Sequence, residues 1–313
     1  MKKYFFIVNT VAANGASLKI WEMIKQELET KQVNYRSFFT KSERHAVELA
    51  KQIANMHHEQ IEAIVAVGGD GTISEVINGV MDGSDIPIGY IPAGSANDFS
   101  RGYSIPASPL TALRTILMKK KLIKKIDVGR YKLGERTKPS YFVNNLGVGF
   151  DAEVSNRANQ SRMKKNFNKL RMGSLVYVGI LLNLLFKYKT TNVELNIDGQ
   201  EYHYQDVWFV TISNQPYYGG GMKISPKANP FDGLLNVTVV HHFPPIKLLL
   251  LFGTVFFGKH TFFKGVNFHI GKEIHILPET KLPMHADGEY IGTSPVSISI
   301  ASHKQPLIVS KRK

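Results

Sequence analysis

The chain has 313 residues, 43% of them hydrophobic and 20% charged, which indicates a soluble globular protein too long for one ordinary core and therefore built from two domains. It contains no cysteine, which excludes disulfides, thiolate metal sites and cysteine nucleophiles and favours a reducing cytoplasm. The formal net charge of +14 favours anionic partners: nucleic acid, acidic lipid headgroups or phosphorylated ligands.

Strands and helices alternate over roughly the first 120 residues. Residues 1–10 lack the long apolar core and cleavage site of a signal peptide, so they are taken as the start of the fold and not as an export signal. Apolar runs predict strands at 4–8, 35–39, 61–67 and 86–91, and helical spacing predicts helices at 17–29, 44–56 and 109–118. This alternation indicates a largely parallel sheet that is covered on both faces.

The pattern changes near residue 127, after which short strands dominate. We expect strands at 140–145, 192–198, 206–213, 234–240, 265–270, 273–277 and 296–300, with a tight hairpin turn at Asp198-Gly199. The second domain should therefore be antiparallel and carry one or two helices. Two apolar stretches, 174–186 and 246–258, are too short to span a bilayer. We expect buried helices there, with partial insertion at a membrane surface as the alternative.

The third predicted strand runs directly into Gly68-Gly69-Asp70-Gly71. In an open α/β sheet, ligands bind beyond the carboxyl ends of the strands, and glycine lets backbone N–H groups approach a ligand. Thr72 is expected to cap the next helix, whose N-terminus favours a phosphate. Asp70 would then bind a divalent cation or orient the hydroxyl of a nucleophile. The plain alternative is an exposed aspartate in a glycine-rich turn.

Two further strand ends carry compatible chemistry. Gly94, Ser95, Asn97 and Asp98 follow the fourth strand, and the small-residue loop 9–15 follows the first.

The sequence "GVGFDA" at 147–152 fits a dinucleotide fingerprint, but no acidic residue follows about 20 residues later and the motif lies in the strand-rich half. We therefore do not expect a dinucleotide to bind there. No P-loop motif is present.

The motifs "GGDGT" and "PAGSANDFSR" resemble the catalytic domain of the diacylglycerol kinase and sphingosine kinase superfamily. The stretches "NNLGVGFDAEV", "SNQPYYGGGMKISPKANPFDGLLNV" and "HADGEYIGTSP" look like the lipid-kinase domain of its soluble bacterial members. The resemblance implies an α/β nucleotide-binding domain with a parallel sheet like that of NAD kinases and phosphofructokinases, and a C-terminal antiparallel β-sandwich with one or two helices. It also implies a deep cleft between them. The expected domains are 1–127, joined by residues 300–313, and 128–299.

The resemblance also implies the site. ATP should contact Asn9, Thr10, Val11, Ala12, Ala13, Thr40, Gly68, Gly69, Asp70, Gly71, Thr72, Ile73, Ser74, Gly94, Ser95 and Asn97. Asp70 would hold Mg²⁺ directly or through water, and Glu289 would accept the proton of the lipid hydroxyl. Asp287 would orient neighbours, or serve only as a turn residue. Asn229, Asp232 and the Leu234 carbonyl match a structural magnesium site.

The chain departs from the family pattern at four points: Ala13 stands where glycine is usual, Ser74 where asparagine is usual, Ser95 where threonine is usual and Phe231 where an acidic residue is usual. Neither Asp70 nor Glu289 is lost. These changes suggest a divergent branch whose substrate could differ from diacylglycerol.

Basic residues gather beside the apolar stretch at 174–186. They are Arg157, Arg162, Lys164, Lys165, Lys169 and Arg171. Such a cluster suits the anionic inner face of the cell membrane, where a cytoplasmic protein would dock transiently; a solvated helix face is the alternative. No nucleic-acid recognition motif is present, so we do not expect that partner. The scattered histidines are interpreted as structural, with His285 as a candidate to face the cleft.

The sequence thus predicts an ATP-dependent lipid kinase that phosphorylates diacylglycerol or a related lipid alcohol, with a homodimer as a possible state. Two alternatives stay open. One is an NAD kinase-like enzyme acting on a soluble substrate, and the other is a catalytically weak lipid-binding regulator.

Overall fold

The protein is described by a computed structural model that places residues 2–56, 60–134, 138–160 and 182–311. Contacts between Cα atoms divide the chain into two compact units. Unit 1 comprises residues 1–128 and 302–313, and unit 2 comprises residues 129–301. The chain therefore passes from one unit to the other twice.

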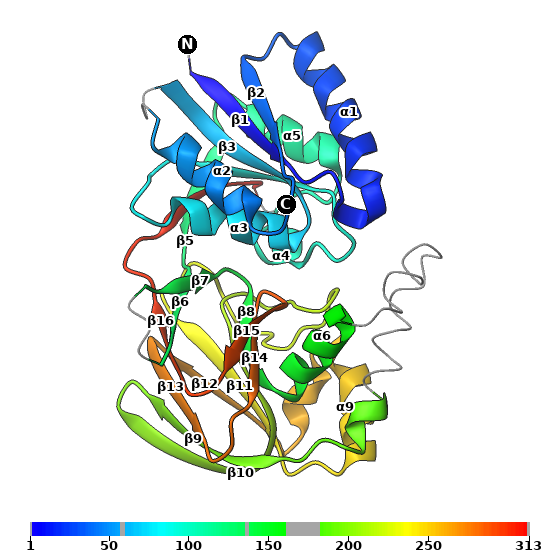
Figure 1. Ribbon diagram of the computed structural model, residues 1–313, viewed down its shortest axis with the longest axis vertical. Helices are drawn as coiled ribbons and strands as arrows, with labels where there is room; N and C mark the ends of the chain where they lie inside the picture. Colours follow the sequence, from blue (N-terminus) through cyan, green and yellow to red (C-terminus); the bar gives the residue numbers. More distant parts are fainter. Residues whose placement is uncertain (1, 57–59, 135–137, 161–181, 312–313) are drawn as a thin grey trace. The chain divides into compact units, whose positions relative to one another are not determined.

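Unit 1 is built on a six-stranded sheet in the order β2-β1-β3-β4-β17-β5 (Figure 1). The first four strands in this order are parallel to one another, β17 is parallel to β4, and β5 is antiparallel to β17. Their bounds are β1 (Lys3–Val8), β2 (Tyr35–Phe39), β3 (Ile61–Gly68), β4 (Ile88–Pro92), β5 (Leu122–Ile126) and β17 (Gln305–Val309). The predicted parallel α/β sheet is confirmed.

Helices cover both faces of this sheet, α1 and α5 on one and α2 and α3 on the other (Figure 1). Each follows the predicted apolar spacing; α1, for example, buries Trp21, Ile24 and Leu28. The helices of unit 1 are the 3₁₀ turn η1 (Ala12–Gly15), α1 (Ala16–Thr30), α2 (His45–Ala54), α3 (Asp70–Val80), the short α4 (Asp98–Gly102) and α5 (Pro109–Leu117).

The C-terminal strand is fixed in unit 1 by polar contacts as well as by its sheet pairing. The Lys304 ammonium lies 2.6 Å from the carboxylate of Asp127, which is fully buried just after β5. The Gln305 side chain donates a hydrogen bond to the Ile86 carbonyl at 2.8 Å. A buried carboxylate needs such a partner, because burial disfavours an isolated charge.

Unit 2 contains an antiparallel system of eleven strands in the order β15-β14-β8-β10-β9-β13-β16-β6-β7, with β11 pairing with β10 and β12. The strands are β6 (Gly129–Leu133), β7 (Ser140–Phe142), β8 (Asn145–Gly149), β9 (Thr191–Ile197), β10 (Gln200–Ser213), β11 (Leu235–His241), β12 (Val266–Gly271), β13 (Glu273–Pro278), β14 (Pro283–Ala286), β15 (Glu289–Thr293) and β16 (Val296–Ile300). The predicted antiparallel sandwich-like second fold is confirmed.

Two details of the strand prediction have different outcomes. The hairpin at Asp198-Gly199 is confirmed, since both residues have positive φ (51° and 86°) between paired β9 and β10. The single strand expected at 140–145 is wrong, because it divides into β7 and β8. The division has a tertiary cause: the amides of Val143 and Asn144 donate to the Asp287 side chain and not to a neighbouring strand.

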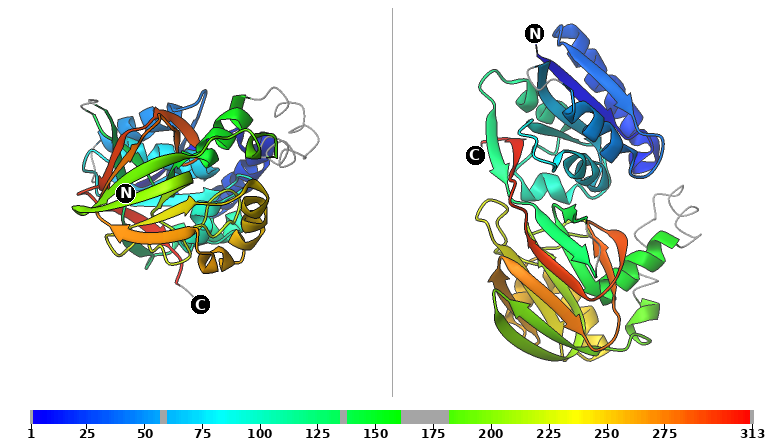
Figure 2. Two further views of the ribbon diagram at one scale, coloured as in Figure 1. Left: turned by 90° about the horizontal axis from the view of Figure 1, so that it is seen from below. Right: turned by 60° about the vertical axis from the view of Figure 1, so that its left-hand side comes forward.

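Among the described residues of unit 2, helices are formed by α6 (Phe150–Gln160), α9 (Pro245–Val255), the 3₁₀ turn η3 (Lys259–Phe262) and residues 182–185. The turn η3 packs beside α9 (Figures 1 and 2). One core fills the space between the strands, and a second lies beneath the helices and contains Phe150, Trp208 and Leu248.

The expectation of fully buried helices at the two apolar stretches is wrong for 246–258. Helix α9 buries Leu248, Leu251 and Val255 but exposes the other side of the helix. Of the stretch 174–186, residues 174–181 lie outside the described part of the chain. Among the described residues, no helix is long and apolar enough to cross a membrane.

Candidate functional site

The loops after β1 and β3 are joined by hydrogen bonds at the point where the strand order of unit 1 reverses. The backbone N–H of Asn9 donates to the Val67 carbonyl at 2.9 Å, and the Asn9 side-chain amide donates to the Thr72 hydroxyl at 3.0 Å. Its side-chain oxygen accepts the N–H of Val11 at 3.2 Å. Open α/β sheets bind ligands at such a reversal. The structure therefore brings the predicted loops 9–13 and 68–74 together.

The loop after β4 closes on the same edge of the sheet. The Asn97 side chain makes two hydrogen bonds with Gly94: its oxygen accepts the Gly94 N–H at 3.1 Å, and its nitrogen donates to the Gly94 carbonyl at 2.9 Å. A Cβ at Gly94 would overlap with the Cα of Gly69. Glycine is therefore required for the two loops to meet, and Ser95 stays exposed beside them.

Asp70 links the β3 loop to the β4 loop. Its two carboxylate oxygens accept the backbone N–H groups of Asp98 (3.0 Å) and Phe99 (2.9 Å), which begin the short helix α4. Asp70 is therefore more than an exposed turn residue. A carboxylate has about four lone-pair sites, so accepting two backbone N–H groups does not by itself exclude a metal ion.

The predicted capping role of Thr72 is wrong. Helix α3 begins at Asp70, its N-cap is Gly69, and no side chain caps it. Thr72 lies inside the first turn, and its hydroxyl accepts the hydrogen bond from Asn9. The first-turn amides of a helix lack intrahelical acceptors and attract anions. The absence of a side-chain cap keeps this turn suited to a phosphate.

The carboxylates of Asp70 and Asp98 both lie near the buried Tyr90. Burial, with the nearby carboxylates of Asp70 and Asp98, raises the pKa of Tyr90 well above its usual value. The Tyr90 hydroxyl therefore stays protonated and lies 3.1 Å from the Gly68 carbonyl and 3.3 Å from the Asn97 side-chain oxygen. Asp98 is buried and pairs with Arg101 at 2.7 Å. Sequence reasoning did not identify Tyr90 or Arg101.

The remaining predicted nucleotide residues of unit 1 lie at the same ends of the strands. Thr40 directly follows β2, and its N–H donates to the Val8 carbonyl at 3.0 Å. Thr10 follows Asn9, Ala12 and Ala13 lie in η1, and Val11 is exposed. Gly71, Ile73 and Ser74 lie in the first turns of α3, and the side chain of Ile73 is buried in the core.

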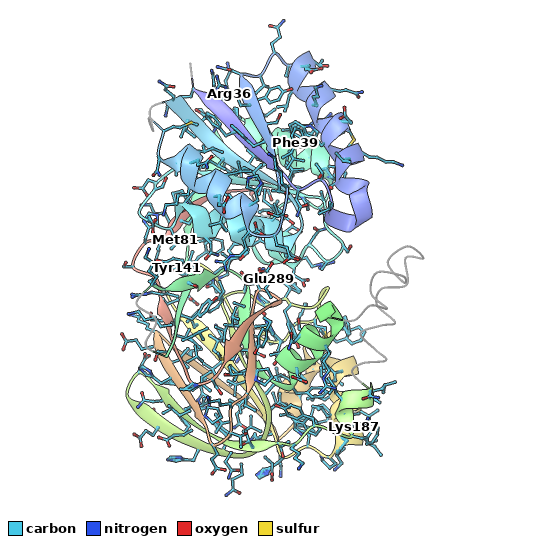
Figure 3. All side chains as sticks on the ribbon, in the orientation of Figure 1. Arg36, Phe39, Met81, Tyr141, Lys187 and Glu289 are labelled. Carbon is cyan, nitrogen blue, oxygen red and sulfur yellow. The ribbon has the colours of Figure 1, made fainter. Side chains whose placement is uncertain are left out.

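In unit 2, Glu289 begins β15 and is exposed, at the hairpin labelled in Figure 3. The preceding turn consists of Asp287 and Gly288, both with positive φ (49° and 87°). The Asp287 carboxylate accepts three backbone N–H groups, from Val143 (2.9 Å), Asn144 (2.8 Å) and Asn145 (3.2 Å). These contacts fix the turn on which Glu289 stands.

A buried contact between a histidine and an aspartate lies directly beneath this turn. The His285 Nε2 lies 3.4 Å from the Asp151 carboxylate, which also accepts the Ala152 N–H and the Thr211 hydroxyl. The other His285 nitrogen accepts the Gly288 N–H at 3.3 Å. Asp151 belongs to the "GVGFDA" stretch, which the sequence predicted not to be a nucleotide motif. Its nearness to His285, 134 positions along the chain, gave no local signal.

The residues predicted to bind a structural magnesium ion lie together in a single turn that precedes β11. The Asp232 side chain accepts the Leu234 N–H at 3.0 Å, and the Asp232 N–H donates to the Asn229 carbonyl at 3.4 Å. In the part of the chain that is described, no three His, Asp or Glu side chains lie close enough to hold a metal ion together. The magnesium assignment at Asn229, Asp232 and Leu234 therefore stays a prediction.

The basic cluster predicted for membrane docking lies largely outside the described residues, from Arg162 to Arg171. Of its members only Arg157 is described, and it pairs with Glu153 at 2.6 Å.

Comparison with known proteins identifies the family. Residues 3–131 match the diacylglycerol kinase catalytic domain, and residues 144–309 match the YegS C-terminal NAD kinase beta sandwich-like domain. The "Putative lipid kinase YtlR" of Bacillus subtilis is 36% identical over 308 residues, covering 98% of this chain and 99% of that protein. A "Diacylglycerol kinase" of Mycobacterium tuberculosis is 32% identical over 238 residues, covering 76% and 74%.

A solved structure from Bacillus anthracis, described as "a putative diacylglycerol kinase", has a TM-score of 0.78 and 26% identity and covers 99% of this chain and 95% of its own. Both halves of the chain and nearly its whole length are thus matched by one kind of enzyme. The chain belongs to the diacylglycerol kinase-like lipid kinase family, with a diacylglycerol kinase catalytic domain followed by a YegS-type C-terminal domain.

Proposed function

We propose that this enzyme transfers the γ-phosphoryl group of ATP to the hydroxyl of diacylglycerol or a related lipid alcohol, giving phosphatidic acid or its analogue. The observation that carries the proposal is the joining of three strand-end loops in unit 1 through the hydrogen bonds of Asn9 and Asp70. Family membership implies that ATP is the donor.

Unit 1, with domain limits 1–127 and 300–313, is the nucleotide domain in this proposal. The amides in the first turn of α3 and the Gly94-Ser95 loop would hold phosphate oxygens, since a helix N-terminus stabilises negative charge. The Asn9 and Asn97 hydrogen bonds keep these loops in place before the nucleotide arrives. Such preorganisation matters because phosphoryl transfer depends mainly on positioning and charge neutralisation.

Asp70 is the proposed ligand of Mg²⁺. The donor set fits, because magnesium in kinases is bound by one or two carboxylates and completes its shell with waters and substrate phosphates. Asp70 offers two oxygens, held in place by the amides of Asp98 and Phe99. When bound, Mg²⁺ supplies neutralisation of the phosphate charge. The role of Asp70 is to hold the cation at the nucleotide loops.

Glu289 is the proposed acceptor of the proton from the lipid hydroxyl. As the hydroxyl oxygen bonds to the γ-phosphorus, the bond to the β-phosphate oxygen breaks, ADP leaves, and the proton passes to the Glu289 carboxylate. Asp287 acts as a positioning residue, because its oxygens accept the amides of Val143 and Asn144, between β7 and β8, and of Asn145 at the start of β8. Unit 2, with domain limits 128–299, is then the lipid domain, and the enzyme works in the cytoplasm with transient docking on the membrane.

The test is an assay of purified protein with γ-labelled ATP and Mg²⁺, in one arm with extracted membrane lipids and in a second arm with NAD. A labelled phospholipid in the first arm supports the proposal, and its chromatographic position identifies the lipid alcohol. Label in NAD alone would reject it in favour of a soluble substrate. Asp70→Ala and Glu289→Gln, checked for folding by circular dichroism, should each lose the lipid product; near wild-type turnover in both would reject the residue assignment.

A further inference from the structure

Unit 2 carries a group of large apolar side chains that the described part of its fold leaves exposed. Helix α9 buries Leu248, Leu251 and Val255 in the core beneath it. The opposite side of the helix and the segment after it leave seven large apolar side chains exposed. We call this the α9–η3 patch: Ile246, Leu249, Leu250, Phe256, Phe257, Phe262 and Phe263.

The exposure of the patch is too large to be incidental. Leu250 is 67% exposed, Phe257 76% and Phe262 85%. Isolated exposed apolar residues are normal, but a contiguous group of them marks a binding surface. The patch also extends toward the edge strand β12, since the ring of Phe268 lies 5.8 Å from that of His260 in η3.

The charged side chains of the segment that carries the patch all have one sign. From His241 to Lys272 the sequence contains four lysines and no aspartate or glutamate. Lys247, Lys259 and Lys264 are all exposed within the patch or at its border. Apolar residues bordered by lysine are typical of segments that lie in the plane of a bilayer with anionic headgroups.

We infer that the α9–η3 patch is the surface on which the enzyme docks onto an anionic lipid bilayer. The inference rests on the proposed lipid kinase function, because a lipid alcohol resides in such a bilayer. With 11 residues, α9 is about half the length needed to span it, so the helix would lie in the interface, with the exposed phenylalanines of the segment that follows it among the acyl chains.

A second copy of the chain fits the patch less well than a bilayer does. A two-fold symmetric contact pairs the same surface on both copies, so the lysine border would face itself. No acidic residue between 241 and 272 is available to neutralise that repulsion. Anionic headgroups neutralise it directly.

The patch is packed onto the same unit as the proposed proton acceptor. Helix α6 contacts β14 and β15, and its Ser155 hydroxyl donates to the Gly288 carbonyl at 3.0 Å. The same helix contributes Phe150 and Val154 to the core beneath α9. Docking through the patch would therefore hold the Glu289 turn at a fixed depth relative to the bilayer.

The test measures binding of the purified protein, without ATP, to vesicles of phosphatidylcholine containing about 30% phosphatidylglycerol. The test variant is Phe257→Ala/Phe262→Ala, and the matched control is Met118→Ala/Leu277→Ala, whose side chains are 55% and 48% exposed elsewhere. We expect the test variant to bind at least about tenfold more weakly and the control to bind as the wild type does. Lys247→Glu should weaken binding about fivefold or more at low salt, and pure phosphatidylcholine vesicles should bind weakly.

Other outcomes would overturn the inference. Equal binding by the test variant and the wild type would exclude this patch as the docking surface, and so would no wild-type binding at low salt. A wild-type dimer that the test variant converts to a monomer would assign the patch to self-association.

A kinase assay with a dispersed short-chain diacylglycerol separates the inference from the proposed function. The patch variant should keep wild-type turnover there while losing vesicle binding. A wild type that binds vesicles through the patch but phosphorylates no lipid would reject the proposed function and leave the docking surface in place.

Discussion

Two β-hairpins of unit 2 turn on the dipeptide Asp-Gly, at Asp198-Gly199 and at Asp287-Gly288, and the two turns are built alike. Each aspartate and glycine has positive φ, as two-residue hairpin turns require. Each aspartate also holds the start of a neighbouring strand. The Asp198 N–H donates to the Glu273 carbonyl while its carboxylate accepts the Glu273 N–H, and Asp287 makes the same pair of bonds with Asn145.

The two turns differ in their surroundings. The amides that reach Asp198 belong to the exposed residues Lys272 and Glu273. Those that reach Asp287 belong to Val143, Asn144 and Asn145, all of which are buried.

The His285–Asp151 pair lies beneath the second turn. The residue that follows the Asp-Gly dipeptide also differs between the two turns. Glu289 comes after Asp287-Gly288, where Gln200 comes after Asp198-Gly199. The comparison shows that the aspartate of a lipid kinase motif can have the same structural role as the aspartate of an ordinary turn, since both accept backbone N–H groups of a neighbouring strand. What distinguishes the motif is the buried support and the carboxylate that follows.

The largest expected difference between the turns concerns the residue that follows each. Glu289→Gln should lower kcat by about 10²–10⁴-fold, the range typical of losing a general base, because the amide cannot accept the proton. The midpoint of urea unfolding should not change, since Glu289 is exposed. Steady-state kinetics with a lipid alcohol measures the effect. The matched variant Gln200→Glu should leave both quantities unchanged, and a Glu289→Gln enzyme with normal kcat would make the two turns equivalent.

The second difference is in stability. Asp287→Ala leaves three buried amides without their acceptor and should lower the free energy of unfolding by about 2–4 kcal/mol. In Asp198→Ala the amides of the exposed Lys272 and Glu273 can bond to water, so the free energy of unfolding should fall by only about 1 kcal/mol or less. Urea unfolding of both variants measures the contrast. Equal losses would mean that burial does not separate the turns.

The support beneath the second turn can be tested at Gly147. A Cβ there would come closer to the Asp151 carboxylate and the His285 ring than real Cβ atoms do. Gly147→Ala should therefore displace the pair, lower the free energy of unfolding by about 1–3 kcal/mol and reduce kcat with little change in the KM for ATP.

The control for this prediction is Gly253→Ala in α9, where an added Cβ meets no atom within 4 Å. It should raise the free energy of unfolding by about 0.5–1 kcal/mol, because glycine weakens a helix interior. If Gly147→Ala behaves like this control, the pair does not support the turn.

The smallest effect concerns pH and should be the same for both turns. Burial lowers the pKa of His260 and of His269 below the usual value. The unfolded chain therefore takes up protons first as pH falls through about 6.5, and the free energy of unfolding falls with it; above that pH both states are neutral and the contribution is complete. Unfolding measured from pH 7.5 to 5.5 should show this slope, and His260→Gln should reduce it.

Asp198→Ala and Asp287→Ala should both keep the wild-type slope, since the buried histidines remain. A slope that changes only in Asp287→Ala would show that the second turn has its own titrating group.

The sequence alone determined the periodic elements. The apolar runs at 4–8 and 61–67 became β1 and β3, because a buried parallel strand needs continuous apolar residues. The motif-bearing loops follow from the same reasoning, since a parallel sheet brings its carboxyl ends to one edge. Turn chemistry also acts locally, so the hairpin at Asp198-Gly199 could be placed to the residue.

Only the tertiary structure decided which groups meet across long sequence separations. The Asp70 carboxylate accepts an amide at the start of α4, and His285 lies beside Asp151. The Asp287 carboxylate accepts amides between β7 and β8, where one strand was expected at 140–145. Helix α9 carries leucines on every side and only Lys247 and Thr254 as polar residues, so its sequence did not separate its buried side from its exposed side. Local spacing fixes what an element is, whereas the partners of a side chain depend on the packing of strands that lie far apart in the chain.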